Sequence, residues 1–164
     1  MKKLIIRYMR TDKTLSPLEI IDKGEWIDLH LAETVHLSQG DFQLLSLGVR
    51  MQLPDGFEAW VVPRSSTFKN FGIIQANSIG IIDSSYCGPN DVWKFPAYAT
   101  KAVALEKGTR ICQFRIMPSQ KANSLVKELW NWEDGIELVE EEWLEGNEES
   151  RGGFGSTGEK WWEM

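Results

Sequence analysis

The sequence contains few of the residues that usually build metal centres or disulfide bridges. Its 164 residues include two cysteines, Cys87 and Cys112, and two histidines, His30 and His36. The cysteines lack the spacing of a zinc site, and without an export signal they are most simply reduced thiols. The histidines are too few and too isolated to form a zinc site. We therefore expect a cytoplasmic protein.

Long apolar runs and an excess of positive charge are also missing. Arg7 and Arg10 interrupt the first apolar stretch far short of a signal-peptide core, so this stretch predicts a first β-strand. No stretch approaches the length of a membrane span. The net charge of −6 and the pI of about 5.0 disfavour binding to duplex nucleic acid. An anionic substrate would therefore require locally concentrated arginines and a divalent cation.

Short β-like runs recur along the chain with turn signals between them. Residues 41–53 end at a Pro-Asp-Gly turn, residues 57–62 end at a proline, and residues 110–116 alternate between apolar and polar. Many short strands separated by glycine and proline predict an all-β sandwich or barrel. We expect one β domain over residues 1–145, followed by a C-terminal arm over residues 146–164.

One segment, residues 119–134, has the spacing of an amphipathic helix rather than of a strand. Its apolar side chains recur every three or four residues, at Ala122, Leu125, Val126, Leu129 and Trp130. Ser119 is the expected N-cap and Gly135 the expected stop. Residues 136–144 then predict a last strand.

The most informative segment lies near the C-terminus, where residues 151–158 read RGGFGSTG. Its glycines allow positive φ angles and let successive N–H groups face one anion. Gly155, Ser156 and Thr157 are candidate ligands, and the permanently charged guanidinium of Arg151 suits phosphate oxygens. The segment predicts an arm that closes over a phosphorylated ligand; a loose glycine-rich tail is the alternative.

Four further segments precede this arm in order. They are residues 26–29 (WIDL), 63–66 (PRSS), 77–88 (NSIGIIDSSYCG) and 108–113 (GTRICQ). With the arm, this ordered series resembles the five motifs of the trimeric dUTPases, which hydrolyse dUTP to dUMP and pyrophosphate. The resemblance covers most of the chain. The sequence around the motifs is similar to that of the family branch found in Bacillus-type bacteria and their prophages.

The resemblance implies a jelly-roll (β-clip) subunit with a short helical insertion, assembled as a homotrimer. Asp83 is the candidate general base, because a carboxylate is needed to orient and deprotonate the attacking water. The family also places Tyr86 under the deoxyribose, where a 2′-hydroxyl would clash. Asn77, with the adjacent backbone and Ile82, is implied to bind uracil, since an amide supplies both a donor and an acceptor.

The resemblance assigns the phosphate groups to a second set of residues. Arg64, Ser65 and Ser66 follow a strand-ending proline, and the family uses this segment to hold the phosphates. Gln113 matches a glutamine that contacts phosphate, whereas Arg110 is either a similar ligand or a brace within the subunit.

Asp28 is the candidate for the metal site. It matches the aspartate of the first motif, which holds Mg²⁺ through water in this family. That role agrees with the preference of Mg²⁺ for a hydrated shell, few protein carboxylates and substrate phosphates.

The chain departs from the family pattern in its arm. The stretch from Arg151 to Phe154 is two residues shorter than in many relatives, roughly 7 Å of extended chain. Phe154 is the usual cover for uracil, but this shortening leads us to predict that Phe95 stacks on the base; the alternative is a core position for Phe95.

A second departure follows the sugar-binding motif. Pro89 and Asn90 precede Asp91 here, whereas the family commonly has an acidic residue directly after the glycine that matches Gly88. Both departures bear on how the candidate base Asp83 is covered.

Two other functions are open alternatives. A dCTP deaminase shares the fold and an Arg-Ser-Ser segment, but the tyrosine after Asp83 and the glycine-rich arm favour a dUTPase. A phage-type dUTPase would add a regulatory protein partner, for which the 119–134 insertion is the candidate surface. Trp161 and Trp162 are either loose tail residues or subunit contacts. The expected partners are dUTP and further copies of this chain, without nucleic acid or membrane.

Overall fold

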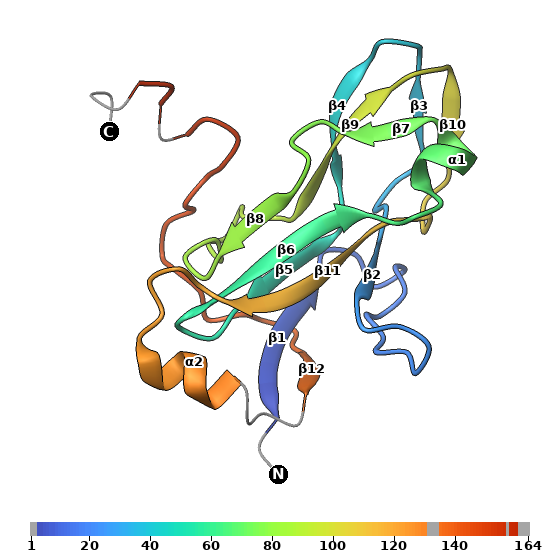
Figure 1. The fold of residues 1–164 in the computed structure, drawn as a ribbon. Coiled ribbons are helices and arrows are strands. Elements are labelled where there is room, and N and C mark those ends of the chain that lie inside the picture. The colour runs from blue at the N-terminus through green and yellow to red at the C-terminus, as the bar shows by residue number, and fades with distance from the viewer. Residues whose placement is uncertain (1–2, 131–134, 157, 161–164) are drawn as a thin grey trace.

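The computed structural model describes residues 3–130, 135–156 and 158–160, and within them the chain is built mainly from β-strands (Figure 1). The strands are β1 (Leu4–Arg10), β2 (Ile27–His30), β3 (Val35–Leu37), β4 (Phe42–Ser46), β5 (Val49–Gln52), β6 (Phe57–Pro63), β7 (Ile73–Gln75), β8 (Gly80–Asp83), β9 (Lys94–Ala99), β10 (Val103–Leu105), β11 (Arg110–Pro118) and β12 (Ile136–Glu140). Two short helices are α1 (Thr67–Phe71) and α2 (Ser124–Trp130). The all-β prediction is confirmed. Among the described residues, no helix has the length and apolar content needed to cross a membrane.

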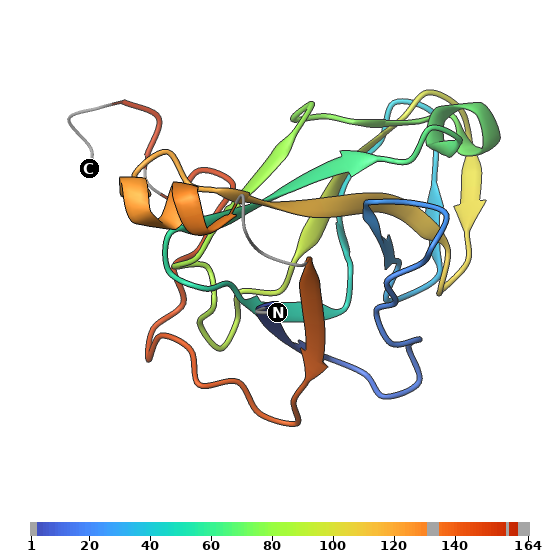
Figure 2. The ribbon, with the colours of Figure 1, turned by 60° about the horizontal axis from the view of Figure 1, so that its bottom comes forward.

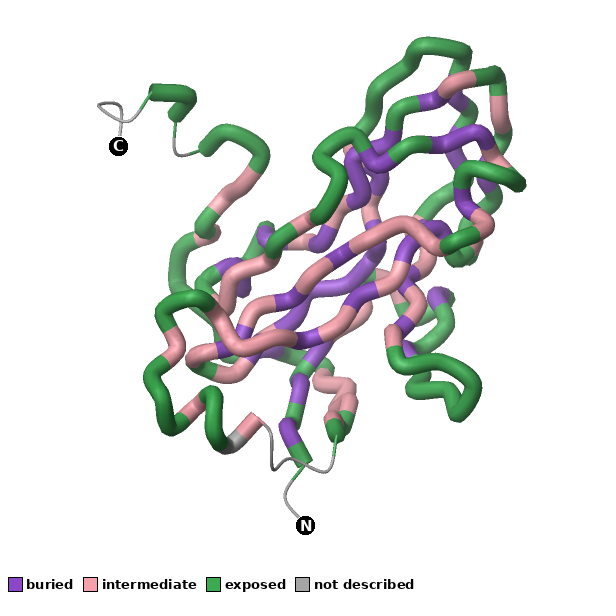
Figure 3. The backbone as a smooth tube through the Cα atoms, in the orientation of Figure 1, coloured by how far each residue is buried: buried purple, intermediate pink, exposed green. Residues whose placement is uncertain are grey.

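The central sheet has the strand order β2-β11-β6-β8 and carries much of the core. Phe114 and Ile116 of β11 lie opposite Val61 and Ala59 of β6, and all four side chains are buried. The residues between them face the other side, because successive side chains of a strand alternate. Figure 3 shows this alternation as buried positions spaced along both strands.

Three smaller sheets complete the fold, with the orders β12-β1-β5, β4-β9-β7 and β10-β3. The last strand ends at Glu140, earlier than the predicted 136–144, and pairs in parallel with β1. Beyond it, Figures 1 and 2 show the C-terminal segment running along the outside of the sheets, and its described residues, 141–156 and 158–160, add no further strand.

The predicted run over 41–53 is interrupted at Gly48. This glycine has a φ of +67°, and a Cβ added there would lie 2.3 Å from a methyl carbon of Leu15. The chain therefore turns at a position that only glycine accepts easily. As a result the run divides into β4 and β5, which belong to different sheets.

The predicted N-cap of the helix is wrong. The N–H of Ser119 donates to the carbonyl of Gly56 at 2.8 Å and its own carbonyl accepts the N–H of Ala122 at 3.0 Å, so this residue opens a turn after β11 and not a helix. The helix begins later, because Oδ1 of Asn123 accepts the N–H of Val126 at 2.9 Å, which is the geometry of an N-cap. Residues 131–134, where we predicted the end of the helix, lie outside the described residues.

One face of α2 packs against the start of β6. Val126 and Trp130 are partly buried against the core, and the Trp130 ring lies 5.6 Å from that of Phe57. Leu125, predicted to share this face, is 61% exposed. The helix is therefore attached through a narrower stripe than its sequence suggested.

Candidate functional site

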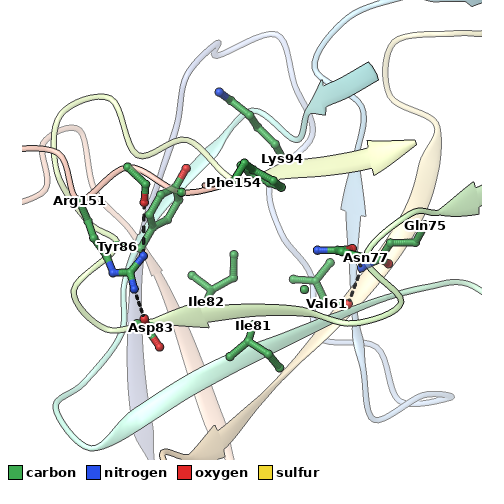
Figure 4. Close-up of a pocket in the computed structure, with 13 residues that line it drawn as sticks. Val61, Gln75, Asn77, Ile81, Ile82, Asp83, Tyr86, Lys94, Arg151 and Phe154 are labelled. Carbon is green, nitrogen blue, oxygen red and sulfur yellow. Dashed lines mark hydrogen bonds and ion pairs between the residues drawn. The ribbon is translucent and has the colours of Figure 1, made fainter. Parts of the chain in front are cut away.

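A cavity of about 320 Å³ lies beside the edge strand β8 (Figure 4). Its volume is in the range of small-molecule sites. The lining includes six residues predicted from the sequence: Asn77, Ile82, Asp83, Tyr86, Arg151 and Phe154. Residues from β6, β7, β8, β9 and the C-terminal arm thus meet at one place.

Asp83 is the last residue of β8 and stands opposite Glu58 of β6. Its Oδ2 lies 2.7 Å from Nη2 of Arg151, and about half of the Asp83 side chain is exposed. The arm arginine therefore pairs with the candidate base while both remain accessible from the cavity. Exposure limits the contribution of such a pair to stability.

Tyr86 forms a fixed wall of the cavity. Its hydroxyl donates to the carbonyl of Val92 at 3.0 Å. Burial raises the pKa of the Tyr86 phenol above its usual value, and the carboxylate of Asp91 raises it further. The phenol is therefore neutral at physiological pH, and its ring is held in one position.

Asn77 lies in the turn before β8 and is contacted by a residue that sequence reasoning missed. Nε2 of Gln75 donates to Oδ1 of Asn77 at 3.0 Å and to the carbonyl of Val61 at 3.0 Å. Gln75 is 4% exposed, although neighbouring Ile74 points outward. The sequence signal for Gln75 was a polar residue at a position that the alternation of the strand places on the buried side.

The predicted phosphate and metal residues lie elsewhere. Oδ1 of Asp28 on β2 forms an ion pair with Nε of Arg64 at 3.0 Å, and Oδ2 accepts a hydrogen bond from Nη1 of Arg110 at 3.0 Å. Gln113 lies beside them on β11, opposite Asp28, and its Nε2 is 3.5 Å from the carbonyl of Pro63. Because β2 and β8 are opposite edges of the central sheet, this group does not share the cavity within one chain.

Ser65 and Ser66 follow Arg64 in the turn that leads into α1. Ser65 is exposed and Ser66 is half-buried. The Ser66 side chain does not cap the helix, so its hydroxyl is not committed to that role. Neither serine lines the cavity, and both directly follow Arg64 of the Asp28 group in sequence.

Comparison with known proteins decides the family. The sequence model of the dUTPase family matches residues 27–158. The chain is 49% identical over 155 residues to the SPbeta prophage-derived deoxyuridine 5′-triphosphate nucleotidohydrolase YosS of Bacillus subtilis (strain 168), covering 94% of this chain and 97% of that protein. This chain belongs to the dUTPase family.

Solved dUTPase structures have the same fold. The dUTPase from Streptococcus mutans aligns with a TM-score of 0.61 at 28% identity, covering 70% of this chain and 94% of that one. A point mutant of the dUTPase from phage phi11 of Staphylococcus aureus, described with a structural Mg(II) ion, aligns with a TM-score of 0.63 at 14% identity over 72% of this chain and 93% of that one.

Within this dUTPase-family site, Phe95 does not occupy the position we predicted. Its side chain is fully buried in the core, and it does not line the cavity. On β9 it is the neighbouring Lys94 that reaches the cavity, because adjacent residues of a strand face opposite sides. The expectation that Phe95 stacks on the base is therefore contradicted, since a buried ring offers no face to a ligand.

Phe154 lines the cavity instead and is 54% exposed. Its φ of 52° lies in the left-handed region, which helps the shortened arm turn its ring toward the cavity. Gly155 and Ser156 follow it and are exposed. Thr157, a further predicted ligand, lies outside the described residues, as do Trp161 and Trp162.

Asp91, which the sequence marked only as a departure from the family pattern, anchors the arm. Its side chain is 1% exposed. Oδ2 accepts the N–H of Gly88 at 2.9 Å and that of Arg151 at 2.7 Å, and Oδ1 accepts the N–H of Gly152 at 3.1 Å. One buried carboxylate thus joins the loop after β8 to the arm.

The arm packs closely against this loop over several residues. A Cβ on Gly88 would lie 2.4 Å from Cα of Ser150, and one on Gly146 would lie 1.8 Å from the carbonyl oxygen of Cys87. Such contacts are open only to glycine. The arm is therefore held on the cavity of its own chain.

Proposed function

We propose that this protein hydrolyses dUTP to dUMP and pyrophosphate. The observation that carries the proposal is the meeting of Asn77, Asp83 and Tyr86 in one cavity of a dUTPase-family chain. The amide of Asn77 suits the uracil ring, and the carboxylate of Asp83 suits the attacking water. The buried phenol of Tyr86 suits the deoxyribose.

In this mechanism Asp83 takes a proton from a water that attacks the α-phosphorus. A bond forms between the water oxygen and phosphorus, and the bond from phosphorus to the oxygen bridging the α- and β-phosphates breaks. Pyrophosphate leaves with that oxygen. The carboxylate is accessible from the cavity, which the general-base role requires.

Recognition of the nucleoside is assigned to the cavity walls. The fixed Tyr86 ring packs against the deoxyribose and disfavours a 2′-hydroxyl, while Asn77, Ile82 and nearby backbone contact uracil. Phe154 covers the base from the arm. Arg151 pairs with Asp83 when no substrate is bound and is suited to turn its guanidinium to phosphate oxygens.

We propose that the phosphate ligands come from a neighbouring copy of the chain in a homotrimer. The separation of the Asp28 group from the cavity within one chain supports this assembly. Arg64, Ser65, Ser66 and Gln113 of one protomer would then face the cavity of the next, which closed symmetry allows for all three sites at once.

Mixing two inactive variants tests this shared site. Asp83→Asn and Ser65→Ala should each be nearly inactive, yet co-folding them should restore activity, because some sites combine the intact half of each variant. Random mixing restores about one site in four of a closed ring. Pyrophosphate release measured before and after co-folding checks the prediction, and no recovery would indicate that one chain supplies the whole site.

The residues around Asp28 fit a hydrated Mg²⁺ and no fully protein-bound ion. In the described part of the chain no group of three His, Cys, Asp or Glu side chains stands together, and each Asp28 oxygen already pairs with an arginine. One carboxylate acting through water, with substrate phosphates as the other ligands, matches the coordination that Mg²⁺ prefers. When bound, the ion would neutralise phosphate charge.

One comparison of substrates tests the activity itself. Pyrophosphate should be released from dUTP with Mg²⁺ present, with little turnover of UTP or dCTP. Ammonia released from dCTP would instead favour the deaminase alternative.

The free, buried state of Cys87 and Cys112 supports a reducing compartment such as the cytoplasm. The regulatory role of the 119–134 segment stays a prediction.

The two phenylalanines should respond differently to truncation. Phe154→Ala should raise the KM for dUTP with little change in melting temperature, because base stacking contributes about 1–3 kcal/mol. Phe95→Ala should cost about 3–5 kcal/mol of folding free energy, because it empties a buried site. Thermal melting and steady-state kinetics on both variants check this, and an elevated KM confined to Phe95→Ala would reverse the assignment.

A further inference from the structure

The orientation of one buried amide determines which atoms Asn77 offers to a ligand. Nε2 of Gln75 lies 3.0 Å from the carbonyl oxygen of Val61. A backbone carbonyl only accepts, so the nitrogen of Gln75, and not its oxygen, must stand there. The second hydrogen of this nitrogen goes to Oδ1 of Asn77 at 3.0 Å.

The orientation of Gln75 is therefore passed on to Asn77. Because Oδ1 faces Gln75, Nδ2 is the part of the Asn77 amide that is free, and Figure 4 shows it pointing toward the cavity. Gly80 leaves room beside it: an added Cβ would be 3.7 Å from Nδ2. The sequence suggested that Asn77 supplies a donor and an acceptor, but its acceptor is already engaged.

The opposite orientation is disfavoured. A flipped Gln75 would set its oxygen against the Val61 carbonyl, placing two acceptors together in a buried site. As it stands, Oε1 of Gln75 has no partner in the part of the chain that the structure describes. The orientation is therefore inferred from the two acceptors around Nε2, the Val61 carbonyl and Oδ1 of Asn77.

We propose that Gln75 is a positioning residue that makes Asn77 present only donors to the cavity. The cavity then selects a pyrimidine with a carbonyl oxygen at ring position 4, as in uracil, over one with an amino group there, as in cytosine. An amino group would place donor against donor, and a site built to hydrogen-bond one group rejects an analogue that leaves polar atoms unpaired. This inference rests on the proposed function, because it specifies the base of the same substrate.

Gln75→Glu is the sharpest test because it keeps the shape and reverses the polarity toward Asn77. Burial favours the neutral acid, whose single hydrogen is required by Val61, so an oxygen then faces Asn77. An ionised carboxylate imposes the same change, since it only accepts. Asn77 should respond by turning its nitrogen to residue 75 and its oxygen to the cavity.

The measurement is equilibrium binding of α,β-imido-dUTP and α,β-imido-dCTP, which needs no turnover. The wild-type protein should prefer the uracil analogue, and the ratio of the two Kd values should fall roughly tenfold or more in Gln75→Glu. Gln75→Leu removes both hydrogen bonds at similar volume and should lower the ratio less, since Asn77 becomes free to adopt either orientation. If the Gln75→Glu variant does not fold, the Kd ratio of Gln75→Leu serves as the test.

Thr100→Val is the matched control. Oγ1 of Thr100 donates to the carbonyl of Gly72 at 2.7 Å, so the variant loses a similar side chain to backbone bond away from the cavity. Its ratio should equal that of the wild type. An unchanged ratio in folded Gln75 variants, or an equal loss in Thr100→Val, would overturn the inference. A wild-type protein that prefers the uracil analogue but releases no pyrophosphate from dUTP would refute the proposed function alone.

Discussion

Replacing Asp83 with asparagine is expected to remove pyrophosphate release from dUTP while leaving the fold and nucleotide binding in place. Asparagine has nearly the same shape but cannot take a proton from the attacking water. Loss of a positioned general base lowers kcat by about 10²–10⁴-fold. The Kd for α,β-imido-dUTP should change far less, because the change removes chemistry and not a cavity wall.

Asp12→Asn provides the matched control for this variant. Asp12 is also an accessible carboxylate in an ion pair, with Nζ of Lys107 at 2.6 Å, and it lies outside the cavity. This control should keep wild-type kcat. Near-normal kcat in Asp83→Asn, measured under saturating dUTP, would exclude Asp83 as the base.

The parts of the site that could be predicted from the sequence are those encoded within one short segment. Asn77, Ile82, Asp83 and Tyr86 lie within ten residues, on the edge strand β8 and the turns that flank it, so their proximity follows from the local chain alone. The strand pattern was equally local, since alternation and turn residues predicted β11 and its neighbour β6.

What the sequence did not reveal depends on contacts between distant segments. Whether Phe95 faces the core or the cavity is decided by which side of β9 packs on the rest of the fold. Gln75 acquires its role only because β7 approaches the carbonyl of Val61 on β6. Ser119 had the right residue type for a cap, but it lies in a turn after β11, and the helix begins only at Ser124. Local propensity was overruled by tertiary structure in each case.

The arm illustrates the same limit and leads to the second large effect. Its glycines and Arg151 were recognisable, whereas its anchor, Asp91, lies 60 residues away in sequence from Arg151. Three N–H groups converge on the two carboxylate oxygens of Asp91. A carboxylate suits this position, because both of its oxygens accept and neither donates.

Asp91→Asn should therefore release the arm and strongly lower activity. The amide keeps one oxygen but turns an NH₂ group toward backbone N–H donors, so at least one buried donor loses its acceptor. That loss costs about 1–3 kcal/mol, enough to loosen the arm at Arg151 and Gly152, whose N–H groups bond to this carboxylate. Because Arg151 and Phe154 then leave the cavity, kcat/KM for dUTP should approach that of a chain lacking residues 151–164.

Limited trypsin digestion measures the release directly, because Arg151 is a cleavage site within the anchored segment. Cleavage after Arg151 should be faster in Asp91→Asn than in the wild type, and α,β-imido-dUTP should slow it in both. Asp41→Asn is the control, since Oδ2 of Asp41 accepts one backbone N–H, that of Ser38 at 2.7 Å, in an exposed turn. If Asp91→Asn kept both wild-type activity and wild-type cleavage, the arm would have to be held by its other contacts with the 85–91 loop, such as the hydrogen bonds from Asn90 to Ser150 and from Asn147 to Ser85.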